Sequence, residues 1–153
     1  MIHIDLICLG KLKETFWREA EAEYLKRLSA FAKIEIHELR EESFGEKDSP
    51  EIVKKKEAEK ILSVLKKQDG LIIVLDEHGK QFSSTAFAGQ IKPAGKLTFI
   101  IGGPLGLDES VLKIANLKLS LSPLTFTHQM ARVILWEQIY RAMMINNGRR
   151  YHY

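Results

Sequence analysis

The fold of this chain is decided by one stretch, Leu97-Thr98-Phe99-Ile100-Ile101-Gly102-Gly103-Pro104-Leu105-Gly106. Its apolar first half predicts a buried β-strand, which ends abruptly in a glycine-rich turn. Asp108 and Glu109 then open a short helical pattern, and a second strand-like run at residues 117–121 ends in the turn 122–127. We expect the two strands to end at tight turns next to one another. Because ligands bind at such strand ends in parallel α/β sheets, the pattern predicts a ligand site here.

Strand-like and helix-like segments alternate along the rest of the chain. The fully apolar runs 71–75 and 97–101 are typical of strands buried on both faces, hence of a parallel sheet covered by helices. Residues 34–39 alternate in polarity, which predicts a half-exposed strand at the sheet edge. The other expected segments are a strand at 2–9, helices at 14–31 and from Pro50 to about Lys67, and a short helix from the capping residue Ser83 to about Gln90. The order predicts an α/β layer fold in a single domain, residues 1–153.

Two of these helices carry apolar stripes that predict their buried faces. The first stripe consists of Phe16, Ala20, Tyr24, Leu28 and Phe31. The second consists of Ile52, Ala58, Ile61, Leu62 and Leu65. In the second helix, Lys54-Lys55-Lys56 lies between Ile52 and Ala58. We expect these lysines to form a solvated face, and the alternative is contact with nucleic acid.

Composition and length are those of an ordinary globular domain. The 153 residues are 45% hydrophobic and 28% charged, and no apolar run approaches the length of a membrane span. Asp5 interrupts the first apolar run and no basic region precedes it, so we expect no signal peptide and a cytoplasmic location. Cys8 is the only cysteine, which excludes an internal disulfide and predicts a small buried side chain. The five histidines show no metal-ligand spacing, so no metal is expected.

The glycine-rich turn is poorly suited to a phosphate. Its spacing is not that of a dinucleotide fingerprint, and Pro104 removes a backbone N–H where an anion cradle needs one. Asp108 and Glu109 at the following helix start would also repel an anion. The turn therefore favours a ligand without phosphates, such as S-adenosylmethionine. The alternative is a turn that merely needs glycines.

The last helical pattern is apolar on two flanks. From Met130 to Ile145 its few charged or amide residues are Arg132, Glu137, Gln138 and Arg141, with Arg132 nearly opposite the other three. A surface helix needs only one apolar stripe. We therefore expect a homodimer that shares this helix, with a deeply buried central helix as the alternative.

The chain ends in a basic and aromatic tail. Asn147-Gly148 predicts a helix stop, and no acid follows Glu137. The tail Arg149-Arg150-Tyr151-His152-Tyr153 could supply phosphate contacts, base stacking and a titratable group for a polyanionic partner. A free, unstructured end would have the same composition.

A set of short motifs runs along nearly the whole chain. They are Leu9-Gly10-Lys11-Leu12-Lys13, Glu23-Tyr24-Leu25-Lys26-Arg27, Gly102-Gly103-Pro104-Leu105-Gly106-Leu107, Ser120-Leu121-Ser122-Pro123-Leu124-Thr125-Phe126, His128-Gln129-Met130-Ala131-Arg132-Val133, Glu137-Gln138-Ile139-Tyr140-Arg141-Ala142 and Tyr151-His152. In order, spacing and total length they resemble the SPOUT-class family of ribosomal RNA large-subunit methyltransferase H. One departure is Tyr153, because relatives usually end in a basic residue directly after the Tyr-His pair.

The resemblance implies a fold and a cofactor. Members of this family are parallel-sheet α/β proteins whose C-terminal segment forms a deep trefoil knot, an exception to the unknotted rule. S-adenosylmethionine binds in the knot and leaves as S-adenosylhomocysteine, and no metal takes part. By position, the cofactor-binding residues would be Leu75, Gly102, Gly103, Leu121, Ser122, Pro123, Leu124, Thr125 and Phe126.

The resemblance also implies a reaction and partners. The family methylates N3 of a pseudouridine in the 23S rRNA of the assembled ribosome, and no membrane is expected as a partner. It acts as a homodimer in which each active site is completed by the partner. By motif, Tyr151, His152 and Arg141 would be catalytic and would orient the base and handle its proton, while the RNA would be held by Arg132, Arg149 and Arg150. The alternatives are a SPOUT enzyme acting on transfer RNA and a non-catalytic ribosome-binding protein.

Overall fold

Strands and helices alternate strictly along the chain in the computed structural model, which describes residues 1–65 and 70–153. The strands are β1 (Ile2–Leu9), β2 (Ala32–Leu39), β3 (Leu71–Lys80), β4 (Lys96–Ile101) and β5 (Leu117–Leu119). The helices are α1 (Thr15–Leu28), α2 (Pro50–Leu65), α3 (Ser84–Ile91), α4 (Glu109–Ile114) and α5 (His128–Asn146). This order is the predicted one. The expected end of α2 near Lys67 lies outside the described residues.

The five strands form one parallel sheet in the order β2-β1-β4-β3-β5. The predicted parallel α/β fold and the edge position of β2 are thereby confirmed. The expectation that β4 and β5 end next to one another is wrong, because β3 lies between them. β3 is also longer than predicted and continues past Asp76 to Lys80, with an irregular register against β5.

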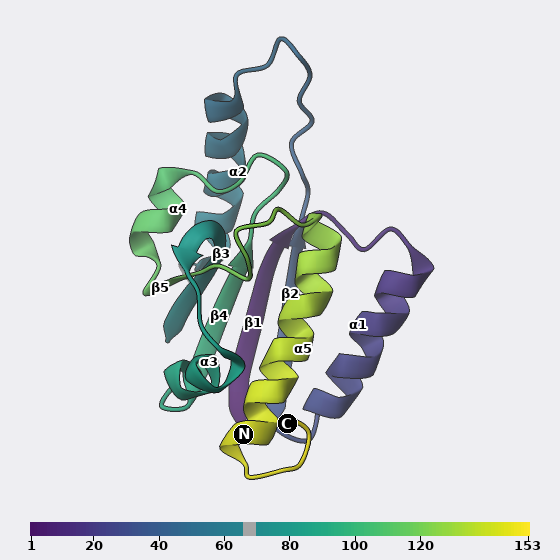
Figure 1. Ribbon diagram of the computed structural model, residues 1–153. Helices are drawn as coiled ribbons and strands as arrows, with labels where there is room; N and C mark the ends of the chain where they lie inside the picture. Colours follow the sequence, from purple (N-terminus) through teal and green to yellow (C-terminus); the bar gives the residue numbers. More distant parts are fainter. Residues whose placement is uncertain (66–69) are drawn as a thin grey trace.

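Helices cover both faces of the sheet (Figure 1). Alternate residues of β1 serve opposite faces: Leu6 packs with α1, α3 and α5, and Ile7 packs with α2. α5 lies between α1 and α3 and buries Trp136 completely in the first core cluster (Figure 1). Because both sheet faces are buried, the carboxyl ends of the strands remain as the accessible edge for a ligand. Among the described helices, none has the length and apolar character needed to cross a membrane.

The predicted stripe of α1 is partly wrong. Phe16 is 59% exposed and packs edge-on against Trp17, while Glu21 faces inward and is buried. The reason is that Glu21 pairs with Arg132 of α5, so a charged side chain takes a core position. In α2, Ile52 is exposed because the buried side of this helix runs through Val53 and its neighbours one and two turns later.

Candidate functional site

A cavity of about 900 Å³ lies at the carboxyl ends of β3, β4 and β5. Its volume lies within the range of small-molecule sites. The walls are the loop 102–107 after β4, the segment before α5 and the first residues of α5. Most of the predicted cofactor-binding residues meet here, namely Leu75, Gly102, Gly103, Leu121, Ser122, Leu124, Thr125 and Phe126. Pro123 is not part of the lining.

The glycine-rich loop is tight for steric reasons. Gly103 and Gly106 pair across the turn, and Gly106 has φ +87°, a conformation that glycine adopts readily. A Cβ at Gly102 would lie 2.9 Å from the Leu107 side chain, so a larger residue would displace the loop. Asp108 caps α4 by accepting hydrogen bonds from the Ser110 hydroxyl and backbone, which hold the pKa of Asp108 below its usual range. This fixed negative charge disfavours a phosphate in the turn.

The segment before α5 is held by the unpredicted extension of β3. The Ser120 hydroxyl lies 3.0 Å from the backbone carbonyl oxygens of Glu77 and Ser122. The Thr125 hydroxyl donates to the Glu77 carboxylate at 2.7 Å. Asp76, Glu77 and His78 line the cavity as well. Sequence reasoning missed them because the apolar signal of β3 ends at Leu75.

A buried carboxylate supports the glycine-rich loop from α2. Glu57 is 4% exposed, and a Cβ at Gly103 would lie 3.4 Å from its carboxylate oxygens. The Glu42 backbone N–H donates to Glu57 at 3.1 Å. Burial raises the pKa of Glu57 above its ordinary value, although that hydrogen bond acts in the opposite direction. The helical pattern gave no sign of this contact, since a glutamate is expected on the solvated face.

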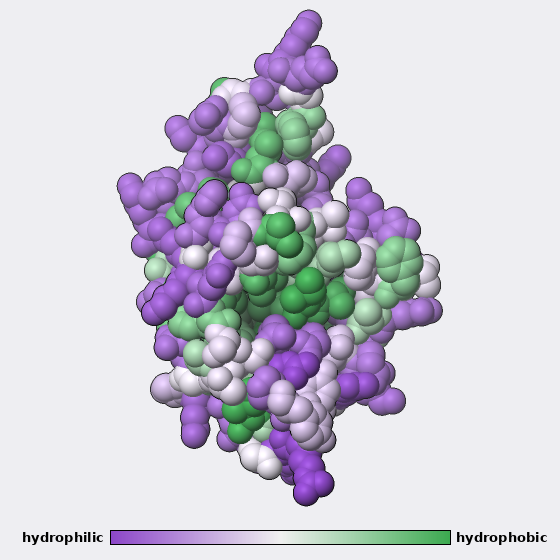
Figure 2. Space-filling model, in the orientation of Figure 1, coloured by the Kyte–Doolittle hydropathy of each residue, from purple (hydrophilic) through white to green (hydrophobic). Residues whose placement is uncertain are grey.

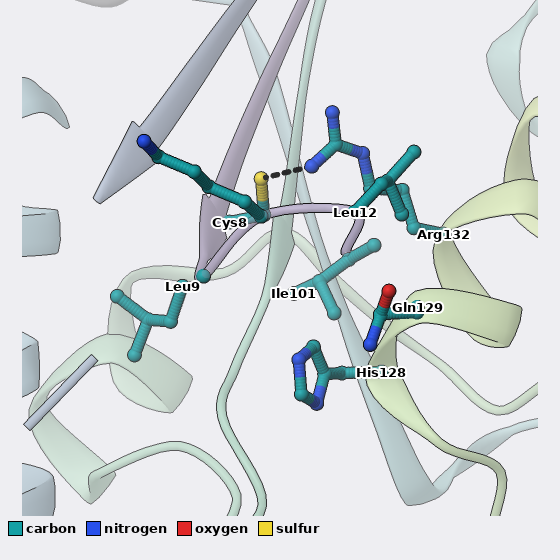
Figure 3. Close-up of a pocket in the computed structure, with 9 residues that line it drawn as sticks. Cys8, Leu9, Leu12, Ile101, His128, Gln129 and Arg132 are labelled. Carbon is teal, nitrogen blue, oxygen red and sulfur yellow. Dashed lines mark hydrogen bonds between the residues drawn. The ribbon is translucent and has the colours of Figure 1, made fainter. Parts of the chain in front are cut away.

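Arg132 lies beneath the cavity of about 900 Å³ and is not part of its lining. Figure 3 shows its side chain beside Cys8 and above His128 and Gln129, around a small cavity of about 10 Å³. Arg132 is 5% exposed and donates to both oxygens of Glu21, to Glu38 at 2.7 Å and to the Cys8 sulfur at 3.4 Å. These contacts occupy the guanidinium and argue against the predicted RNA contact of Arg132.

Cys8 is the buried small side chain that was predicted. Burial raises the pKa of its thiol to about 11, and the opposing effect of Arg132 is smaller. At neutral pH Cys8 is therefore a thiol and a poor nucleophile.

His128 is the first residue of α5. Thr127 caps the helix, and its side chain accepts from the Met130 backbone N–H. The His128 Nε2 atom lies 3.2 Å from a Glu41 carboxylate oxygen, but without the geometry of a hydrogen bond. The ring lines the cavity of about 900 Å³.

The C-terminal tail folds back onto the last turns of α5. Tyr151 donates to the Glu137 carboxylate at 3.0 Å, and Arg141 also pairs with Glu137. The Arg141 guanidinium lies over the Tyr151 ring and 3.1 Å from Nδ1 of His152. The structure thus brings the three predicted catalytic residues together around Glu137, which the sequence analysis did not select. Arg149 and Arg150 are exposed beyond them.

Burial raises the pKa of Tyr151 to about 12, and the hydrogen bond to Glu137 adds to this shift. The phenol is therefore a hydrogen-bond donor at every physiological pH. The cluster around Glu137 also contains the cation Arg141. The hydrogen bond to Glu137 raises the pKa of Arg141.

The tail cluster and the cavity of the same chain lie at opposite ends of α5. The cavity surrounds the start of the helix, and the C-terminus lies at the other end (Figure 1). From Gln129 to Arg141 the helix rises about 18 Å, at 1.5 Å per residue. Within one chain, the three predicted catalytic residues do not reach the cavity.

The outer face of α5 remains partly apolar. Its inner side is buried between α1 and α3, but the helix is not deeply buried on all sides, as the alternative of a central helix would require. On the outer side Met130 is 37% exposed and Ile134 is half-buried. Figure 2 shows hydrophobic side chains gathered over the first half of α5, next to the segment before it. Such a contiguous patch is typical of a protein interface.

Comparison with known proteins identifies the family of the chain. The family described as "Predicted SPOUT methyltransferase" matches residues 2–152. A protein of Pseudothermotoga lettingae is 47% identical over 98% of this chain and 99% of its own length. Proteins of Lactobacillus delbrueckii subsp. bulgaricus and Clostridium acetobutylicum are 45% and 44% identical, each over 99% of both chains. All three are named "Ribosomal RNA large subunit methyltransferase H". The chain belongs to the SPOUT methyltransferase family.

Proposed function

We propose that this protein transfers the methyl group of S-adenosylmethionine to N3 of a pseudouridine in the 23S rRNA of the assembled ribosome, with S-adenosylhomocysteine as the second product. The observation that carries the proposal is the cavity at the carboxyl ends of β3, β4 and β5, where most of the residues matching the family's cofactor motif meet. Relatives of nearly equal length are named as methyltransferases of large-subunit ribosomal RNA. We expect the protein to act in the cytoplasm.

The cavity suits this cofactor chemically. Leu75, Leu121 and Phe126 offer apolar surface for an adenine ring, and Asp76 and Glu77 offer carboxylates for ribose hydroxyls or a cationic group. The acid-capped loop after β4 lacks the anion cradle that a phosphate would need. When bound, S-adenosylmethionine supplies an electrophilic methyl group on its sulfonium sulfur. The trefoil knot of the family remains a prediction for this chain.

We infer that the active site is completed by a second copy of the chain. The residues matching the family's catalytic motif lie about 18 Å along α5 from their own cavity. If the outer faces of two α5 helices pair in antiparallel orientation, the tail of each chain lies beside the cavity of the other. The apolar patch on the first half of α5 supports such a contact (Figure 2).

The tail can orient the base and stabilise its developing charge. Loss of the N3 proton of pseudouridine to water leaves negative charge on the base, and the Arg141 guanidinium is a permanent cation that can stabilise it. Arg141 donates to Nδ1 of His152 at 3.1 Å, so a neutral His152 carries its proton on Nε2. That N–H is then a donor for a carbonyl oxygen of the base. Arg149 and Arg150 are exposed and can contact phosphates.

The proposal is tested by transfer of a labelled methyl group to ribosomes that lack this modification. Wild type should label the 23S pseudouridine, and His152→Ala should lose most of the activity while binding S-adenosylmethionine normally. Label on transfer RNA instead, or cofactor binding without transfer to any RNA, would contradict the proposal.

A further inference from the structure

We propose that Lys54 is a substrate-binding residue that contacts a phosphate of the RNA strand whose base enters the cavity. This inference rests on the proposed function and concerns α2, a helix outside the family motifs quoted above. Lys54 is half-buried and lines the cavity of about 900 Å³ beside the loop 102–107. It is the one lysine or arginine among the described residues of that lining.

The position of Lys54 is fixed by its own helix. Glu57 follows one turn later, and residues three apart lie on the same side of a helix. Glu57 is buried against Gly103, so the side of α2 that carries Lys54 faces the glycine-rich loop. α2 and the preceding loop project beyond the carboxyl ends of the strands (Figure 1). Lys54 therefore stands at the edge of the cavity, where an RNA strand would approach.

The charge of Lys54 is not neutralised within the chain. Among the described residues no carboxylate forms an ion pair with it, whereas Lys60 on the same helix pairs with Glu42 at 2.8 Å. Its field lowers the pKa of Asp108 and Glu51, but the hydrogen bonds of those two carboxylates are larger causes. A cation without a partner at the mouth of a cavity attracts an anionic ligand.

A polyanion explains the surroundings better than the single carboxylate of the cofactor. Lys55 and Lys56 follow directly and are exposed, so positive charge continues from the cavity edge onto the outer surface of α2. The cofactor offers one carboxylate, which needs no such continuation. An RNA strand carries a phosphate at every nucleotide and would meet these side chains in succession.

The test compares Lys54→Gln with Lys33→Gln, a matched removal of one exposed positive charge at the start of β2, the opposite end of the sheet. The substrate is unmodified ribosomes, and the affinity for S-adenosylmethionine is measured separately by calorimetry. We expect Lys54→Gln to raise KM for ribosomes about three- to tenfold with kcat little changed. We expect the slope of log KM against log salt concentration to fall by about 0.7–0.9. Lys54→Arg should have the wild-type KM and the wild-type salt dependence, and Lys33→Gln should change neither quantity.

Two results would contradict the role of Lys54, and a third would contradict the proposed function. If Lys54→Gln weakens S-adenosylmethionine binding instead, Lys54 holds the cofactor carboxylate and the inference is wrong. If KM and its salt dependence are unchanged in Lys54→Gln, no phosphate is bound there and the inference is also wrong. If the wild-type protein methylates no ribosome, the proposed function itself is wrong. This outcome is distinct from the other two because it appears in the wild type, before any variant is compared.

Discussion

Arg132 donates two parallel hydrogen bonds to the carboxylate of Glu21, at 2.6 and 2.8 Å, although 111 residues separate the two in sequence. The pair is buried between α1 and α5, and Trp136 donates a third hydrogen bond to Glu21 at 2.8 Å. Glu38 adds the end of β2 to this network. Three elements that meet beneath the cavity are thus tied together by one guanidinium, which makes the network a determinant of the site's shape.

The first prediction concerns this pair. Arg132→Met leaves two carboxylates near each other without their cation, so we expect the free energy of unfolding to fall by about 3–5 kcal/mol. The double variant Arg132→Met/Glu21→Met removes one of those charges and should be less destabilised than Arg132→Met alone. Urea unfolding at a fixed protein concentration measures both effects. Equal stability of Arg132→Met and wild type would show that the network does not support the fold.

The glycine-rich loop should tolerate no side chain at Gly102. A Cβ there would lie 2.9 Å from Leu107, so Gly102→Ala shifts the loop that forms one wall of the cavity. We expect the affinity for S-adenosylmethionine to fall about tenfold or more, measured by calorimetry. Gly89→Ala is the matched control, because Gly89 lies in α3 with nothing within 4 Å of an added Cβ. It should leave the affinity unchanged and stabilise the helix by about 0.5–1 kcal/mol. Unchanged affinity in Gly102→Ala would place the cofactor elsewhere.

Tyr151 should resist ionisation. Its pKa of about 12 in the folded protein exceeds the usual value of about 10, so folding favours the neutral phenol. The resulting stability is fully present below about pH 10 and is lost as the pH rises towards 12. NMR of ring-labelled tyrosine, assigned with Tyr151→Phe, should show this phenol mainly protonated at about pH 11. Glu137→Gln should lower the pKa. Ionisation of Tyr151 near pH 10 in the wild type would show that the tail is not held against α5.

Cys8 should be inert in the folded protein. Burial and a thiol pKa of about 11 leave almost no thiolate at about pH 8. Alkylation by iodoacetamide should therefore be slow in the native state and fast in urea, with mass spectrometry reporting a single site. Rapid native alkylation would mean that α5 opens away from β1.

The sequence predicted the α/β order and the parallel sheet because both leave local signals. The apolar run 97–101, the cap Ser83 and the stop Asn147-Gly148 each have a mechanism that acts within a few residues, and the structure confirms them. The extension of β3 past Asp76 was missed because it depends on pairing with β5 across the fold. Strand order was missed for the same reason, since no local pattern places β3 between β4 and β5.

Buried charges account for the remaining differences. Glu21 and Glu57 are buried although charged helix residues are expected on the surface, and Arg132 is buried although the resemblance to the family implied contact with RNA. Each is buried because a partner distant in sequence satisfies it, and such a pairing has no local signature. The likeness of short motifs located Arg141, Tyr151 and His152, but only the folded chain shows that Glu137 joins them.

The central claim, one active site built from two chains, is tested most directly by complementation. Gly102→Val disables the cavity, and Arg141→Ala/His152→Ala disables the tail. The two variants are co-expressed with different tags, and methyl transfer to unmodified ribosomes is measured. Half of randomly assembled dimers are mixed, and each mixed dimer holds one complete site and one site that carries both defects. About a quarter of all sites are therefore complete, so we predict recovery of about a quarter of the wild-type activity. Activity no higher than the sum of the two variants measured alone would contradict the claim, because it would show that the cavity of one chain and the tail of another do not combine into a working site.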